Sequence, residues 1–111
     1  MPTAAEVTPE KWSEITILFD NGDYSIISGA YEGEGPALGE RWNGHERALG
    51  FPNVAGYPVW HVVPEFLTIP ILHGLLDELA RSGQSQPPER TEYILRELAR
   101  RQSARQLTQV A

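Results

Sequence analysis

The sequence predicts an α+β fold, in which a four-stranded, mostly antiparallel meander sheet is followed by two helices. Residues 14–63 hold short runs of β-branched and aromatic residues separated by Gly, Pro and Asn. Residues 68–82 and 88–106 instead carry apolar residues at helical spacing. Strands joined by short loops pair with their neighbours, and these helices follow the strands rather than alternate with them. We therefore expect an antiparallel sheet with the helices gathered after it.

The composition bounds the class of protein. With 111 residues the chain has the size of one domain, so we expect residues 1–111 to form a single unit. It contains no cysteine, which excludes disulfides, thiol catalysis and cysteine-based zinc sites. Because no apolar run is long enough to span a bilayer and the N-terminus lacks the pattern of a signal peptide, we expect a cytoplasmic protein without membrane contact.

The first two strands form a predicted hairpin. The dipeptide Asn21-Gly22, typical of a two-residue turn, separates residues 14–20 from residues 23–31. Such a turn would set the register of the pair, because every side chain alternates between the two faces. One face would carry Ile15, Ile17, Phe19, Tyr24 and Ile26, and the other Thr16, Leu18, Ser25, Ile27 and Tyr31.

Two further strands surround a long connection. Residues 37–43 alternate as a third strand, and residues 59–63 form a fourth strand that Pro64 ends. Residues 43–58 between them are rich in Gly and Pro and lack periodicity. Connections of this length in compact domains are often binding loops.

Two helices complete the chain. Residues 68–82 form a helix with Thr68 at its N-terminus and one continuous apolar stripe, and residues 84–88 form a polar linker. The second helix, residues 88–106, has only a thin apolar stripe, so it should dock on the body or on a second subunit. We expect this C-terminal helix or a second copy of the chain to cover the second sheet face, and therefore expect a homodimer.

Glu40 and His61 are the candidate catalytic residues. If Leu38 and Trp42 point into the core, strand alternation sends Glu40 to the same side, and His61 lies in an equally apolar strand. An unpaired buried charge is very costly, so we expect the two side chains to approach each other on neighbouring strands. A carboxylate beside an imidazole is a minimal general acid–base unit. Alternatively, residues 37–43 form an edge strand and Glu40 simply reaches water.

Aromatic and hydrogen-bonding groups around the long connection could form a small-ligand pocket. The alternative is that the two tryptophans only fill the core. The candidate ligand-binding residues are Arg41, Trp42, Asn43, His45, Tyr57 and Trp60.

Metal and nucleic-acid sites have little support. The spacing of His45, His61 and His73 matches no compact ligand pair, so we expect neither a metal nor another cofactor. The formal net charge of −6 argues against nucleic-acid binding, which depends on Lys and Arg. The arginines that recur in the last helix, Arg96, Arg100, Arg101 and Arg105, are diluted by glutamates.

The sequence therefore favours a small, homodimeric accessory protein that binds a small molecule or a protein partner. The alternative is a small enzyme in which Glu40 and His61 act as an acid–base pair on a polar or anionic small molecule.

Overall fold

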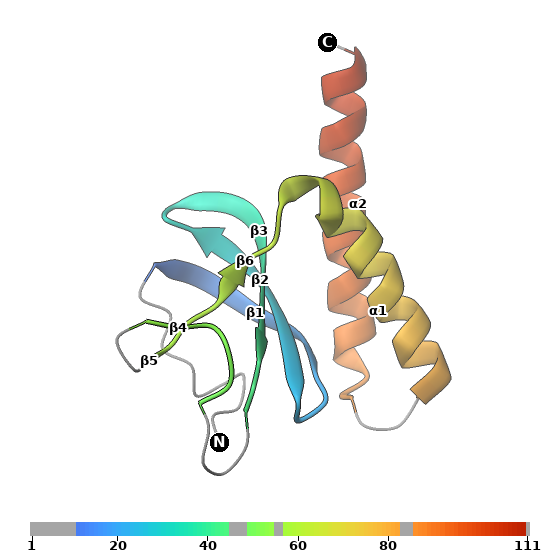
Figure 1. Cartoon of the computed structure of the whole chain (residues 1–111). Coiled ribbons are helices and arrows are strands. Elements are labelled where there is room, and N and C mark those ends of the chain that lie inside the picture. The colour runs from blue at the N-terminus through green and yellow to red at the C-terminus, as the bar shows by residue number, and fades with distance from the viewer. Residues whose placement is uncertain (1–10, 45–48, 55–56, 83–85, 111) are drawn as a thin grey trace.

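The computed structural model describes residues 11–44, 49–54, 57–82 and 86–110, and for residues 54, 57, 82 and 105–110 the backbone alone. A four-stranded antiparallel sheet lies against a pair of helices (Figure 1). In chain order the elements are β1 (Trp12–Asp20), β2 (Tyr24–Tyr31), β3 (Glu34–Trp42), β4 (Asn53–Val54), β5 (Tyr57–Pro58), β6 (His61–Val62), the 3-10 helix η2 (Glu65–Leu67), α1 (Thr68–Ser82) and α2 (Glu89–Val110).

This architecture confirms the predicted α+β fold. The sheet has the order β1-β2-β3-β6 with every pair antiparallel, as the meander prediction requires. The bounds of α1 agree with the prediction, whereas α2 continues past the predicted end at residue 106. The long connection contains an unpredicted two-stranded pair, β4 and β5.

The predicted two-residue hairpin turn is wrong. Asp20 pairs with Ser25, so the turn between β1 and β2 is wider than Asn21-Gly22. The reason is the side chain of Asn21, whose Oδ1 accepts hydrogen bonds from the backbone N–H groups of Asp23 and Tyr24 at 2.9 and 2.8 Å. An asparagine that bonds the following backbone in this way builds its own local turn.

A bulge in β1 also changes which residues share a face. The register shifts between Ile17 and Phe19, so that Leu18 and Phe19 both become buried in the core beside the helices. Ile15 and Ile17 move to the opposite face. The predicted composition of the two faces is therefore wrong for these residues, because strict alternation ends at a bulge.

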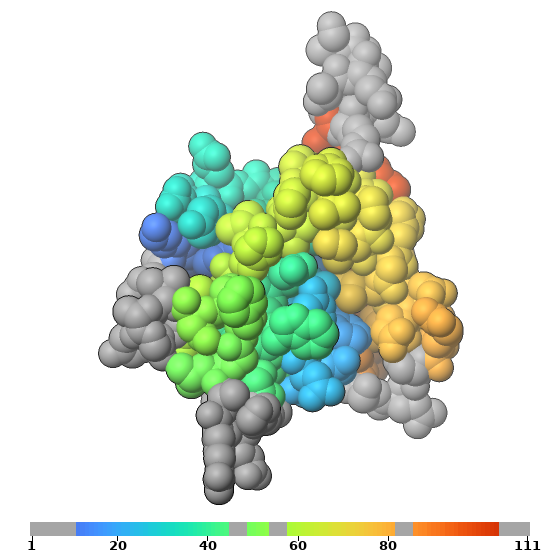
Figure 2. Space-filling model, viewed as in Figure 1, coloured from blue at the N-terminus to red at the C-terminus, as the bar shows by residue number. Residues whose placement is uncertain are grey.

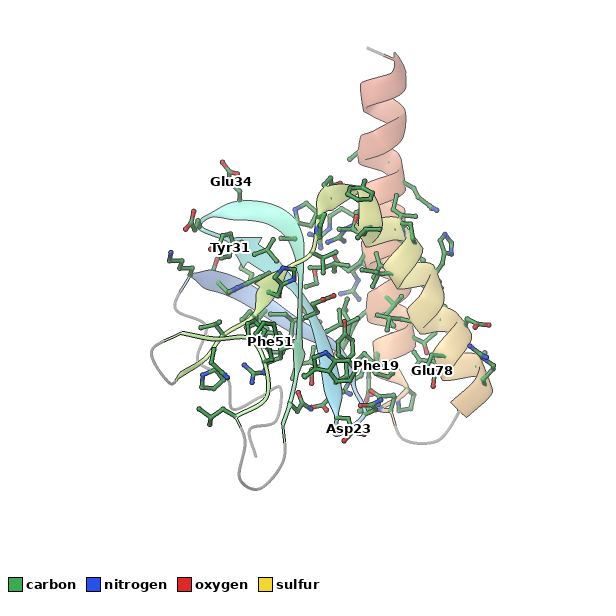
Figure 3. All side chains as sticks on the ribbon, in the orientation of Figure 1. Phe19, Asp23, Tyr31, Glu34, Phe51 and Glu78 are labelled. Atoms are coloured by element: carbon green, nitrogen blue, oxygen red, sulfur yellow. The ribbon has the colours of Figure 1, made fainter. Side chains whose placement is uncertain are left out.

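Both helices cover the same face of the sheet. In Figure 1 they lie together on one side of the strands, and in Figure 3 Phe19 lies between the strands and α1. Burying this much apolar surface is the main stabilising contribution of the fold. The main core consists of Leu18, Phe19, Ile26, Leu38, Val63, Leu72, Leu75, Ile94 and Leu98.

The opposite face is covered by tryptophans rather than by the C-terminal helix, which corrects the prediction. Trp12 and Trp60 are buried there with Ile27. Trp12 crosses the sheet over Gly39, where a Cβ atom would lie only 3.0 Å from the indole ring. The apolar residues of this face are therefore buried without α2 or a second subunit.

Arg41 holds the long connection against the sheet. Its side chain is only 1% exposed. Nη1 donates to the carbonyl oxygens of Pro52 and Val59 at 3.1 and 2.9 Å, and Nη2 donates to the carbonyl oxygen of Leu49. Burial lowers the pKa of Arg41, and the three carbonyl dipoles take the place of water around the guanidinium.

We expect Arg41→Met to destabilise the protein by about 2–4 kcal/mol, because three buried carbonyl groups lose their donor. Urea unfolding would measure this change. Arg81→Met is the matched control, since the Arg81–Asp77 pair is exposed and should contribute less than about 1 kcal/mol. Equal stability of the two variants would contradict this role of Arg41.

Candidate functional site

The candidate site lies on the helix-facing side of the sheet, at the end of the strands where β3 meets β6. Alternation along β3 places Glu40 and Trp42 on the same face as the core residue Leu38. The register of the ladder then sets His61 opposite Glu40, and Tyr24 opposite Trp42. We call Tyr24, Glu40, Trp42, Phe51 and His61 the β3–β6 surface.

Glu40 and His61 meet, as the sequence suggested. Their closest atoms, His61 Nδ1 and Glu40 Oε1, are 3.7 Å apart. The side chain of His61 is 58% exposed and that of Glu40 is 32% exposed. The pair therefore lies at the surface, with the imidazole more open to solvent than the carboxylate.

Tyr24 completes the environment of Glu40. Its hydroxyl donates a hydrogen bond of 2.9 Å to Oε2 of Glu40. Burial, with further contributions from this bond and from the charge of Glu40, raises the pKa of the Tyr24 hydroxyl well above its usual value. Tyr24 therefore stays protonated, and the carboxylate is held between a phenol and an imidazole.

Two large aromatic side chains lie exposed beside this group. Trp42 is 58% exposed and Phe51 is 66% exposed. Two backbone hydrogen bonds join these residues, from Trp42 N–H to Phe51 O at 2.8 Å and from Phe51 N–H to Trp42 O at 2.9 Å. The rings of Tyr24 and Trp42 meet edge to face, with centroids 4.9 Å apart. The result is an aromatic surface next to a carboxylate.

Three other predicted ligand-binding residues lie in the interior. Arg41 uses its terminal nitrogens on backbone carbonyls. Asn43 is 1% exposed, accepts from the Ser25 hydroxyl at 2.7 Å and donates to Asp20 at 3.0 Å. Trp60 is buried on the opposite sheet face from Trp42, so the two tryptophans do not wall one pocket.

Two predicted ligand-binding residues are not placed by the structure. His45 lies outside the described residues, and Tyr57 is described by its backbone alone, in β5. Among the described residues, no group of three or more His, Asp or Glu side chains could hold a metal ion.

The arginines of α2 are dispersed rather than gathered in one row. Arg101 is buried against Glu97, Arg100 also pairs with Glu97, and Arg96 stacks on the ring of Tyr93. Arg90 donates to Gln86, and the side chain of Arg105 is not described. A phosphate backbone would therefore find few free cations on the described part of this helix.

Tyr24 and Phe51 are the site residues that sequence reasoning missed. Tyr24 stands in the predicted second strand, but the sequence offered no register between that strand and residues 37–43. Phe51 stands in the long connection, where no periodicity indicates the direction of a side chain. The dense aromatic content of residues 42–60 was the only available signal.

Comparison with known proteins gives no relative from which a function could be inferred. No protein family, no curated protein and no solved structure matches this chain. Within the described residues, no helix has both the length and the apolar character needed to cross a bilayer.

We expect Glu40→Gln to lower the pKa of Tyr24 towards its usual value of about 10, because the substitution removes a negative charge beside the phenol. The pKa should stay somewhat raised, since burial is its largest cause. Titration of the tyrosine Cζ signals by NMR would measure it. Glu34→Gln, at the exposed first residue of β3, is the control.

The same shift affects stability. The pKa of Tyr24 is higher in the folded than in the unfolded protein, so the protonated hydroxyl contributes to the free energy of unfolding. This contribution is complete below about pH 10 and is lost as the pH rises above that value. Alkaline loss of stability should end at a lower pH in Glu40→Gln than in the parent protein. Titration of Tyr24 at the same pH in both proteins would contradict the role of Glu40.

Proposed function

We propose that this protein is a small accessory binding protein, and that the β3–β6 surface recognises a protein segment carrying a basic side chain among apolar residues. The observation that carries the proposal is the exposure of Trp42 and Phe51 side by side at a sheet edge. Large exposed aromatic residues are costly in water and are the commonest anchors of protein interfaces.

Charge favours a basic partner. Glu40 supplies a carboxylate within the β3–β6 surface, and the formal net charge of the chain is −6. Aromatic ring faces also attract Arg and Lys by cation–π interaction. A guanidinium or ammonium group could thus contact both a ring and Glu40, while neighbouring apolar residues of the partner cover Phe51.

The open form of the surface supports a macromolecular partner over a small molecule. In Figure 2 residues 49–54 and β6 meet the ends of β2 and β3 on one outward face. Small-molecule sites usually enclose most of their ligand. Trp60, which could have supplied an opposing wall, is buried on the other side of the sheet.

The second candidate is a small enzyme that uses Glu40 and His61 on a polar or anionic small molecule. The contact of 3.7 Å between these side chains supports it. However, Glu40 already accepts from Tyr24, and an exposed pair excludes little water from a reaction. His61→Asn distinguishes the two: an enzyme would lose turnover, whereas a binding protein should retain its aromatic anchors.

A cytoplasmic location and a homodimer remain part of the proposal. The absence of cysteine supports the location. The homodimer is supported by α2, whose C-terminal end extends beyond the sheet and α1 (Figure 1). An isolated helical segment of this length is marginal in water, and packing against its counterpart in a second copy would stabilise it.

A peptide-selection experiment tests the binding function. We expect peptides selected from a random library to contain Arg or Lys beside apolar residues. They should bind the double variant Trp42→Ala, Phe51→Ala at least about tenfold more weakly, as loss of hot-spot residues implies. Leu95→Ala, which removes an exposed apolar side chain from α2, should leave binding unchanged.

Two results would refute this assignment: recovery of no specific peptide, or equal affinity of the selected peptides for the parent and double-variant proteins.

Sedimentation equilibrium tests the homodimer. We expect twice the chain mass of 12.4 kDa. Removal of residues 105–111 should return the mass to that of one chain, because it shortens the projecting helix and leaves every residue of the main core in place. A full-length protein that sediments as a single chain would rule the homodimer out.

A further inference from the structure

A cavity of about 360 Å³ lies between the sheet and α2. It opens on the same sheet face as the β3–β6 surface but at the other end of the strands. Figure 3 marks these two ends with Asp23 and with Tyr31 and Glu34. Its volume lies within the range of small-molecule sites. The lining consists of Glu14, Thr16, Ser28, Gly29, Ala30, Gly33, Gly35, Pro36, Glu97 and Arg100.

The two side chains that α2 gives to the cavity, Glu97 and Arg100, belong to an ion cluster with Arg101, which does not line the cavity. Glu97, only 6% exposed, accepts from Arg100 Nη2 at 2.9 Å through Oε2 and from Arg101 Nη1 through Oε1. One carboxylate thus stands between two guanidinium groups. An exposed i,i+4 pair on a helix contributes little, but here Glu97 and Arg101 are buried. Together with Arg100, whose side chain is 52% exposed, the three groups carry a net charge of one cation.

Arg101 makes this net charge more costly. The residue is 4% exposed, and its Nε and Nη2 atoms have no hydrogen-bond partner among the described residues. These two atoms form the side-on edge that holds a carboxylate in bidentate fashion. Buried donors without an acceptor destabilise the protein. Because Arg101 does not line the cavity, an anion bound there would act on it only by balancing the net charge of the cluster through Arg100.

The β1 wall carries the opposite charge. Glu14 lines the cavity from a bulge between Ser13 and Thr16, and its backbone has a φ of 55°. A residue other than glycine in this region is strained, and such strain often marks a functional site. A Cβ atom at Gly29 would lie 2.8 Å from the carbonyl oxygen of Ser13, so only glycine fits against the bulge.

We propose that this cavity binds a small zwitterion of the free α-amino acid class. The ammonium group lies at Glu14 and the carboxylate at the Arg100 end, where it neutralises the ion cluster on α2. The hydroxyl groups of Thr16 and Ser28 lie along the same strand face and can hydrogen-bond the ligand. An anion alone would leave Glu14 without a partner, and a cation alone would leave the net charge of the Glu97, Arg100 and Arg101 cluster unbalanced.

Titration of the full-length, ¹⁵N-labelled protein with free glycine, L-serine and L-glutamate, followed by NMR, tests this site. We expect saturable shifts of the Gly29, Gly33 and Gly35 amides with at least one of them. N-acetylglycine and glycinamide, which each lack one of the two charges, should cause no such shifts. Glu14→Gln and Arg100→Gln should each weaken binding about tenfold, as loss of a charged partner implies.

The control is Glu92→Gln, an exposed position on α2 that is not part of the cavity lining, and it should bind as the parent protein does. Absence of shifts with all three amino acids would overturn the site. If N-acetylglycine or glycinamide bound as tightly as the free amino acids, the requirement for both charges on the ligand would be refuted. The blocked derivatives use the parent protein, so the result stands even if a variant fails to fold.

The double variant Trp42→Ala, Phe51→Ala should retain amino-acid binding, which separates failure of this site from failure of the β3–β6 surface.

Discussion

The buried guanidinium of Arg41 is the interaction on which the β6 side of the sheet depends. Its terminal nitrogens donate hydrogen bonds to the carbonyl oxygens of Leu49, Pro52 and Val59. These bonds hold the long connection, which has no periodicity of its own, against β3. That fixation carries Phe51 to the edge of Trp42 and leads the chain into β6. Arg41 therefore shapes a surface that it never reaches, because its side chain points to the opposite face.

Much of the fold could be predicted from the sequence because it follows from periodicity. The bounds of α1 and the order of the four main strands come from helical and alternating patterns. The turn at Asn21 and the bulge at Leu18 could not be predicted in this way. Each depends on a local competition, in which an amide side chain replaces a backbone bond or one extra residue enters a strand.

The site was predictable only where alternation continued without interruption. Glu40 was expected on an apolar face and is found there, 3.7 Å from His61. The pocket expected between Trp42 and Trp60 does not form, because the second residue follows the long connection and lies on the other face. Tyr24 joins the site through strand register, which one sequence does not specify. Alternation thus predicts the sheet face on which a side chain lies, but not which residue of the neighbouring strand it contacts.

One sheet face carries both proposed sites, and the order of residues along β2 explains how. Tyr24, Ile26 and Ser28 follow one another on the helix-facing side. The first belongs to the β3–β6 surface, the second to the core, and the third to the cavity beside α2. The helices bury the middle of this face, and at one end α2 continues as a wall of the cavity, so polar groups remain accessible at both ends. Two chemically different sites can therefore coexist, with the core between them and no shared side chain.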